Sequence, residues 1–236
     1  MVHMYHDTRQ ASADKLHFFG ILRDIDSTSV GCLAIVIIGA PLTKGMAVTA
    51  SGNKMIRYVA FLRAINVAGQ KLIKMEELAR IFTAAGLKNV RTYIQSGNVI
   101  FDAKQASALA LRRKIEIALQ KVLGYEVTVM IQSLADIEEI VRRNPFQKIK
   151  TGAEAAVYVV FLSDEPRRVP KLPLVSAIEN VDIFEVSERA AFVVSRRKKN
   201  GGFGYPNKFV EKELGVWGTT RSWNTVNKIL KAAEKP

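Results

Sequence analysis

From Met55 onward, short apolar segments of strand character alternate in a fixed order with segments that carry a helical apolar stripe. The strand-like segments are rich in Val, Ile and aromatic residues, whereas the helical segments repeat apolar residues every three or four positions. In the first half of this region the sequence predicts strands at 56–63, 90–95, 99–102 and 126–132 and helices at 75–85 and 106–123. The resulting βαββαβ order is that of ferredoxin-like folds.

The second half repeats part of this order after a further helix that begins at Ser133 and ends before Pro145. A loop rich in Pro and Arg lies between the first strand of this half and the helix that follows it. The pattern predicts a strand at 156–162, a short helix at 175–180, a hairpin of 183–186 with 191–195, and helices at 206–214 and 221–233. We therefore predict an α+β fold made of two small ferredoxin-like subdomains, the second a variant with two C-terminal helices.

The first 54 residues differ from the rest of the chain. They contain all three histidines and the single cysteine, their charges nearly cancel, and no helical or strand period covers 3–29. The apolar run at 30–40 is too short for the ~20 residues that a membrane helix needs, so we expect no membrane association. We interpret 1–54 as a poorly ordered extension, followed by subdomains at 55–148 and 149–236.

The charge of the chain favours anionic partners. The net charge is +13, and residues after Lys54 carry 30 of the 35 basic residues but 18 of the 22 acidic ones. Such a field attracts nucleic acid, nucleotides or other small anions without specifying which. A single cysteine excludes an internal disulfide framework and fits a reducing compartment, so we expect a cytoplasmic protein.

Residues 55–236 contain no histidine and no cysteine. Their absence excludes Ser-His-Asp and Cys-His catalysis, thiol redox chemistry and His/Cys zinc sites from this region. The acidic residues are scattered along the sequence. We accordingly expect no metal and no cofactor.

Three loops are candidates for anion binding. The first, 195–206, reads SRRKKNGGFGYP and includes Lys198 and Lys199. Glycines let backbone N–H groups turn inward, and Pro206 suits the first position of a helix, so this loop could cradle an anion at a helix N-terminus. The alternative is a solvated surface loop.

The second candidate is 219–224. Thr220 is placed to cap the last helix, and Arg221 in the first turn would oppose the helix dipole, which suggests a role beyond helix stability. Arg221 could hold a phosphate or carboxylate bidentately. Trp223 shares a helical face with apolar residues and fits a core position, and Asn224 could bind ligand or hold a neighbouring loop.

The third candidate follows the first strand, at 63–74, and includes Arg63, Asn66 and Lys71. Gln95 and Asn98, at the turn between the next two strands, complete it. Loops at strand ends commonly carry binding sites on a rigid frame. The alternative is that these polar side chains hold their own turns.

Three stretches carry a family resemblance: FLRAINVAG at 61–69, TYIQSGNV at 92–99 and TTRSWNTV at 219–226. They resemble the signature stretches of the bacterial family called domain of unknown function 1697, over about 55–236. The resemblance implies two linked α+β subdomains of ferredoxin-like character and implies no activity.

Two interpretations of function remain, with a third beside them. The first is a non-enzymatic module that binds an anion, a nucleotide or a nucleic-acid backbone. The second is a small cofactor-independent enzyme acting on a phosphorylated or carboxylated substrate, which requires Arg63, Asn66 and Arg221 to converge in one pocket. The third is a protein-interaction module. The oligomeric state is left open.

Overall fold

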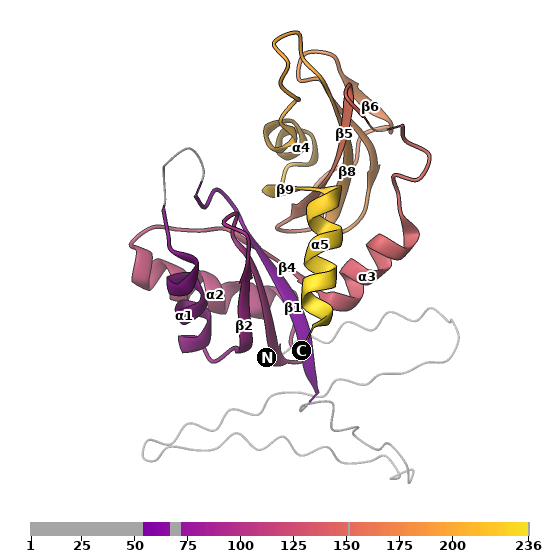
Figure 1. Cartoon of the computed structure of the whole chain (residues 1–236). Coiled ribbons are helices and arrows are strands. Elements are labelled where there is room, and N and C mark those ends of the chain that lie inside the picture. The colour runs from indigo at the N-terminus through magenta and orange to yellow at the C-terminus, as the bar shows by residue number, and fades with distance from the viewer. Residues whose placement is uncertain (1–53, 67–71, 151, 236) are drawn as a thin grey trace, which may run out of the picture. The chain divides into compact units, whose positions relative to one another are not determined.

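The computed structural model describes residues 54–66, 72–150 and 152–235, all within the unit Val48–Pro236 (Figure 1). These residues form an α+β fold with two antiparallel sheets, as the sequence predicts. Except for Lys54, the N-terminal extension lies outside the described residues, and the division at 148/149 stays a prediction.

The first half has the predicted βαββαβ order. Its elements are β1 (Met55–Leu62), α1 (Met75–Ala84), β2 (Lys88–Tyr93), β3 (Asn98–Lys104), α2 (Ala108–Leu123) and β4 (Val129–Ser133). The strands form one sheet in the order β2-β3-β1-β4, and α1 and α2 pack on one face of it (Figure 1). Leu78 and Phe82 of α1 and Ile115 and Leu119 of α2 are buried there.

The predicted helix after Ser133 is α3 (Leu134–Arg143). The Ser133 hydroxyl accepts a hydrogen bond from the Asp136 N–H, and the Asp136 carboxylate accepts one from the Ser133 N–H, each at 3.1 Å. This reciprocal capping box satisfies two N–H groups at the helix start. Asn144, in the left-handed conformation at φ 44°, ends the helix.

The second half forms a five-stranded sheet in the order β6-β7-β8-β5-β9. Its elements are β5 (Ala155–Leu162), β6 (Leu174–Ser176), β7 (Val181–Val186), β8 (Ala190–Arg196), α4 (Pro206–Leu214), β9 (Gly218–Ser222) and α5 (Trp223–Glu234). Strands β7-β8-β5-β9 repeat the arrangement β2-β3-β1-β4 of the first sheet. The ferredoxin-like variant has α4 at the place of α2 and the edge strand β6 at the place of α1.

The predicted short helix at 175–180 is wrong. Leu174–Ser176 is an edge strand, in which Leu174 pairs with Ile183 and Ser176 with Val181. The segment between Pro173 and β7 is too short for a packed helix, and β-branched Val175 favours an extended backbone. The chain after Ser176 therefore turns directly into β7.

The predicted start of the last helix at 221 is also wrong. Thr220 and Arg221 belong to β9, which pairs with β5, and α5 begins at Trp223. The helix is capped by Ser222, whose hydroxyl accepts from the Thr225 N–H at 3.2 Å. Thr219 and Thr220, which come before Arg221, are β-branched, and β-branched residues favour a strand over the first turn of a helix. Arg221 therefore lies outside the first turn and does not oppose its dipole.

The two sheets share one hydrophobic core. The Phe61 ring of β1 stacks on the Phe161 ring of β5 with centroids 3.9 Å apart. Helices α3 and α5 contribute Ile137, Val226 and Ile229 to the same cluster. The face of the first sheet that α1 and α2 leave uncovered is thus buried by elements from further along the chain.

A repeated contact relates the two halves. Glu116 of α2 accepts a hydrogen bond from the N–H of Val129, the first residue of β4, at 2.9 Å. Glu211 of α4 accepts one from the N–H of Gly218, the first residue of β9, at 3.0 Å. In both halves a helical glutamate therefore fixes the beginning of the strand that follows the helix.

Candidate functional site

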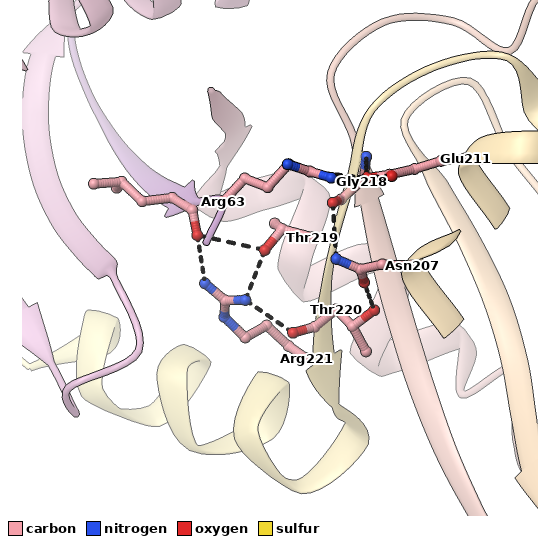
Figure 2. Close-up of polar contacts among 8 residues, drawn as sticks. Arg63, Asn207, Glu211, Gly218, Thr219, Thr220 and Arg221 are labelled. Atoms are coloured by element: carbon pink, nitrogen blue, oxygen red, sulfur yellow. Dashed lines mark hydrogen bonds and ion pairs between the residues drawn. The ribbon is translucent and has the colours of Figure 1, made fainter. Parts of the chain in front are cut away.

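Arg221 is the most deeply buried cation among the predicted site residues. It lies on β9 with 7% of its surface exposed, and its guanidinium reaches into the first sheet (Figure 2). Its Cζ also lies 5.6 Å from the centre of the Phe61 ring. The guanidinium donates to Asn98 Oδ1 (2.5 Å), Ser96 O (2.7 Å), Thr220 O (2.8 Å), Thr219 Oγ1 (2.9 Å), Leu62 O (3.3 Å) and Gly97 O (3.5 Å).

These acceptors are all neutral oxygens, and burial lowers the pKa of Arg221 to about 10. The side chain therefore remains charged at neutral pH. Each of its three nitrogens donates to the protein itself, so an external anion would have to displace existing hydrogen bonds. In this geometry Arg221 fastens the turn between β2 and β3 onto β9.

Gln132 of β4 occupies the position that corresponds to Arg221. Gln132 pairs with Val59 of β1, as Arg221 pairs with Val159 of β5. Its amide reaches across to the Arg189 carbonyl at 3.4 Å, in the way that Arg221 reaches the turn of the first sheet. The shorter amide makes one long contact where the guanidinium makes six.

Arg63 forms an ion pair at the end of β1 (Figure 2). Its Nε donates to Glu211 Oε1 at 2.8 Å and its Nη2 to Glu211 Oε2 at 3.1 Å. The guanidinium lies 4.5 Å from the centre of the Trp217 ring, which is 55% exposed. Because the same carboxylate also accepts from Gly218, Glu211 connects the end of β1 to the start of β9.

Thr220 lies on the same strand but points elsewhere. Its hydroxyl donates to Asn207 Oδ1, and Asn207 Nδ2 donates to the Gly218 carbonyl at 3.2 Å (Figure 2). Asn207 is itself buried at the start of α4. Thr220 thus joins β9 to α4 and caps no helix.

Asn66 and Gln95 hold a turn together. The Asn66 amide donates to the carbonyls of Ile73 (3.1 Å) and Gln95 (3.2 Å), and its oxygen accepts from the Ile73 N–H at 2.8 Å. Both side chains border a hollow beside α1 that neither Arg63 nor Arg221 lines. Lys71 lies outside the described residues.

Lys198 and Lys199 lie at the other end of the second sheet. The loop that contains them leaves β8 at Arg196, which pairs with Ala155, whereas Gly218 pairs with Leu162 at the far end of β5. At about 3.4 Å per residue, the two ends of β5 are about 24 Å apart. The structure therefore brings Arg63, Asn98, Thr220 and Arg221 together but leaves this loop apart from them.

The loop is fixed by its own backbone. The Lys198 N–H donates to Gly202 O at 2.6 Å, and the Gly201 N–H donates to Lys198 O at 2.9 Å. The buried Ser195 hydroxyl, before the loop, donates to the carbonyl of Gly204, near the end of the loop, at 2.8 Å. The glycines thus allow a tight turn and a close approach to the preceding strands.

A second group of cations lines a groove that sequence reasoning missed. The groove has a volume of about 480 Å³ and lies between α5 and the face of β2 and β3. Its four charged lining residues are all basic, and no carboxylate is among the described residues that line it. This groove, here called the α5 groove, is lined by Arg91, Thr92, Tyr93, Ile100, Lys228, Lys231, Ala232 and Lys235.

One helical face supplies the lysines. Lys228, Lys231 and Lys235 follow Asn224 at intervals of four, three and four residues, and all four side chains are exposed. Residues at this spacing lie on one side of a helix. The predicted site residue Asn224 thus lies on the same helical face as the lysines but does not line the α5 groove.

Two arginines hold the end of α5 in place. Arg57 donates to the Ala233 carbonyl at 2.6 Å, and Arg91 donates to the Lys235 carbonyl at 2.7 Å. Arg57 is itself oriented by Asp102, at 2.8 and 3.1 Å. Cations at a helix C-terminus satisfy its last carbonyls and interact favourably with its dipole, so these contacts fix the position of the helix end that carries the lysines.

The lysine periodicity was visible in the sequence, but its partner strand was not. The three lysines lie close together near the C-terminus, whereas Arg91 and Tyr93 come from an element far earlier in the chain. Only the fold places β2 beside α5. Among the described residues, no group of three His, Cys, Asp or Glu side chains could hold a metal, and no helix is long and apolar enough to cross a membrane.

Comparison with known proteins agrees with this architecture. The model of the family described as protein of unknown function (DUF1697) matches residues 55–192, which is more than half of the chain. A conserved bacterial protein from Streptococcus pneumoniae has a similar structure, with a TM-score of 0.54 and 21% sequence identity. The match covers 77% of this chain and 100% of that one, and it concerns the fold. The curated proteins give no match.

Proposed function

The chain belongs to the DUF1697 family, and from its basic groove we propose that it binds the phosphate backbone of nucleic acids. The α5 groove carries this proposal. The lysines Lys228, Lys231 and Lys235 supply most of its positive charge, and no carboxylate is among the described residues that line it. Lys and Arg side chains that neutralise phosphates supply most of the affinity of non-specific nucleic-acid binding.

The surrounding charge supports the same conclusion. Residues 196–236 hold ten basic residues and three acidic ones, and 55–236 have a net charge of +12. A field of this sign accelerates the approach of polyanions. Lys228 and Lys231 extend from α5, and Lys235 follows its fixed C-terminal end, so binding orders few backbone atoms.

An enzyme that holds its substrate between Arg63 and Arg221 has less support. The Arg63 guanidinium is paired with Glu211, and that of Arg221 donates to six protein oxygens. Neither arrangement leaves a bidentate fork directed at solvent.

A cytoplasmic location, which we also propose, rests on the single cysteine and agrees with a nucleic-acid partner.

Fluorescence anisotropy with labelled oligonucleotides across a salt series tests the proposal. If the three lysines contact phosphates, the slope of log K against log salt should approach about −2.7 for duplex DNA, at about −0.9 per contact. The double substitution Lys228→Gln and Lys231→Gln should make this slope less steep by about 1.8 and weaken binding at low salt.

The loop pair Lys198→Gln and Lys199→Gln is the matched control. It removes the same charge from a loop that does not line the α5 groove, so a groove-specific effect should be absent from it. Equal losses in the two double variants would reduce the effect to net charge. No binding by the unaltered protein at low salt would overturn the proposal.

A further inference from the structure

We propose that the α5 groove selects single-stranded over double-stranded nucleic acid, with a base resting on its floor and phosphates on its lysine rim. This inference rests on the proposed function and adds the class of nucleic acid. It follows from the different chemistry of the two parts of the groove: the rim is basic, whereas the floor is apolar.

The floor is formed by Tyr93, Ile100 and Ala232. Ile100 is buried, and the Tyr93 ring is partly buried against the core shared by the sheets. A duplex presents sugars and phosphates on its outside and keeps its base faces stacked within. A single strand exposes those faces, so it alone offers an apolar surface together with its phosphates.

Tyr93 is held in a position that suits a stacking platform. It is the last residue of β2 and pairs with Asn98, whose amide donates to the Tyr93 carbonyl at 3.0 Å. Asn98 is fully buried and is itself bonded by Arg221 at 2.5 Å. The tyrosine backbone is therefore fixed before any ligand arrives, which reduces the entropy lost on binding.

The dimensions of the α5 groove agree with this mode. Its volume of about 480 Å³ lies within the usual range for pockets that bind small organic groups. Lys228 lies on α5 and Lys235 caps its C-terminal end seven residues later, which corresponds to a helical rise of about 10.5 Å. The rim is thus long enough to contact more than one phosphate of an extended strand.

The full-length protein should be titrated with a labelled single strand, its duplex, and an abasic strand that keeps sugars and phosphates but lacks bases. We expect the single strand to bind at least about tenfold more tightly than the duplex at equal salt. Because one base stacked on an aromatic side chain contributes about 5- to 150-fold in affinity, the abasic strand should lose that factor. The abasic probe requires no change to the protein.

Variants at Tyr93 give a second measurement. Tyr93→Leu should weaken binding of the single strand by a similar factor, leave duplex binding unchanged, and keep the salt slope. Tyr93→Phe should retain single-strand affinity because the ring is kept. Thermal unfolding of each variant checks that the fold is intact.

The outcomes separate the two claims. Equal affinity for single strand, duplex and abasic strand, with a salt slope that depends on Lys228 and Lys231, would overturn the strand preference and leave backbone binding standing. Failure of all three probes to bind would overturn the proposed function itself.

Discussion

Replacing Arg221 by methionine should destabilise the protein by about 3 kcal/mol, although it removes a charge from the core. Three acceptors within 2.8 Å lose their donor, namely Asn98 Oδ1, Ser96 O and Thr220 O. A buried acceptor left without a partner costs about 1–3 kcal/mol. Relief from burying an isolated guanidinium returns several kcal/mol, and methionine fills part of the volume, so the net loss lies well below the sum of the three.

Urea unfolding followed by circular dichroism measures this difference. Gln132→Met is the matched control, because Gln132 occupies the corresponding position in β4 and makes a single long contact of 3.4 Å. We expect its effect to be about 1 kcal/mol or less. If Arg221→Met leaves the free energy of unfolding unchanged or raises it, the guanidinium makes no net contribution to stability or destabilises the fold, and the idea that it fastens the two sheets together is refuted.

Two further substitutions test particular contacts. The hydrogen bond from Arg57 lowers the pKa of Asp102 below its usual value. The ionised Asp102 carboxylate therefore stabilises the fold at neutral pH, and this stabilisation is lost as the pH falls below about 4 and the carboxylate is protonated. Asp102→Asn should therefore lower stability at pH 7 and flatten the acid limb of a pH–stability curve; an unchanged acid limb would contradict this. Gly204→Ala should cost about 3 kcal/mol or prevent folding, because the added Cβ would overlap the Glu179 carbonyl oxygen. Gly202→Ala, whose Cβ would have ordinary contacts, should change the urea midpoint little, and equal effects of the two would refute the steric argument.

Much of the fold could be predicted from local pattern. The strand and helix order of the first half, the capped helix after Ser133 and the hairpin of the second sheet are all as expected. Both errors lie where a short segment could satisfy two patterns. Leu174–Ser176 and Gly218–Ser222 become strands because neighbouring strands offer them backbone hydrogen bonds, which is tertiary information that a helical period does not contain.

The candidate site shows the same limit in a different form. Sequence reasoning selected Arg63 because its loop follows a strand, and Arg221 because it was expected in the first turn of the last helix, where its charge would oppose the dipole. The partners that engage them, such as Glu211 and Asn98, come from elements remote in sequence. The α5 groove was missed for the same reason, since Tyr93 and Lys228 meet only through the arrangement of β2 and α5.

The placement of α5 has a consequence for how the chain folds. This last helix of the second half helps to bury the face of the first sheet that carries Val59 and Phe61, and Arg57 of β1 binds its final turn. Each sheet has one face covered from within its own half, but its other face is buried in a cluster that residues of both halves form. We therefore expect residues 55–235 to unfold as one cooperative unit, and either half expressed alone to expose an apolar sheet face and aggregate. We therefore expect that neither half, transplanted into another protein, would fold as an independent module.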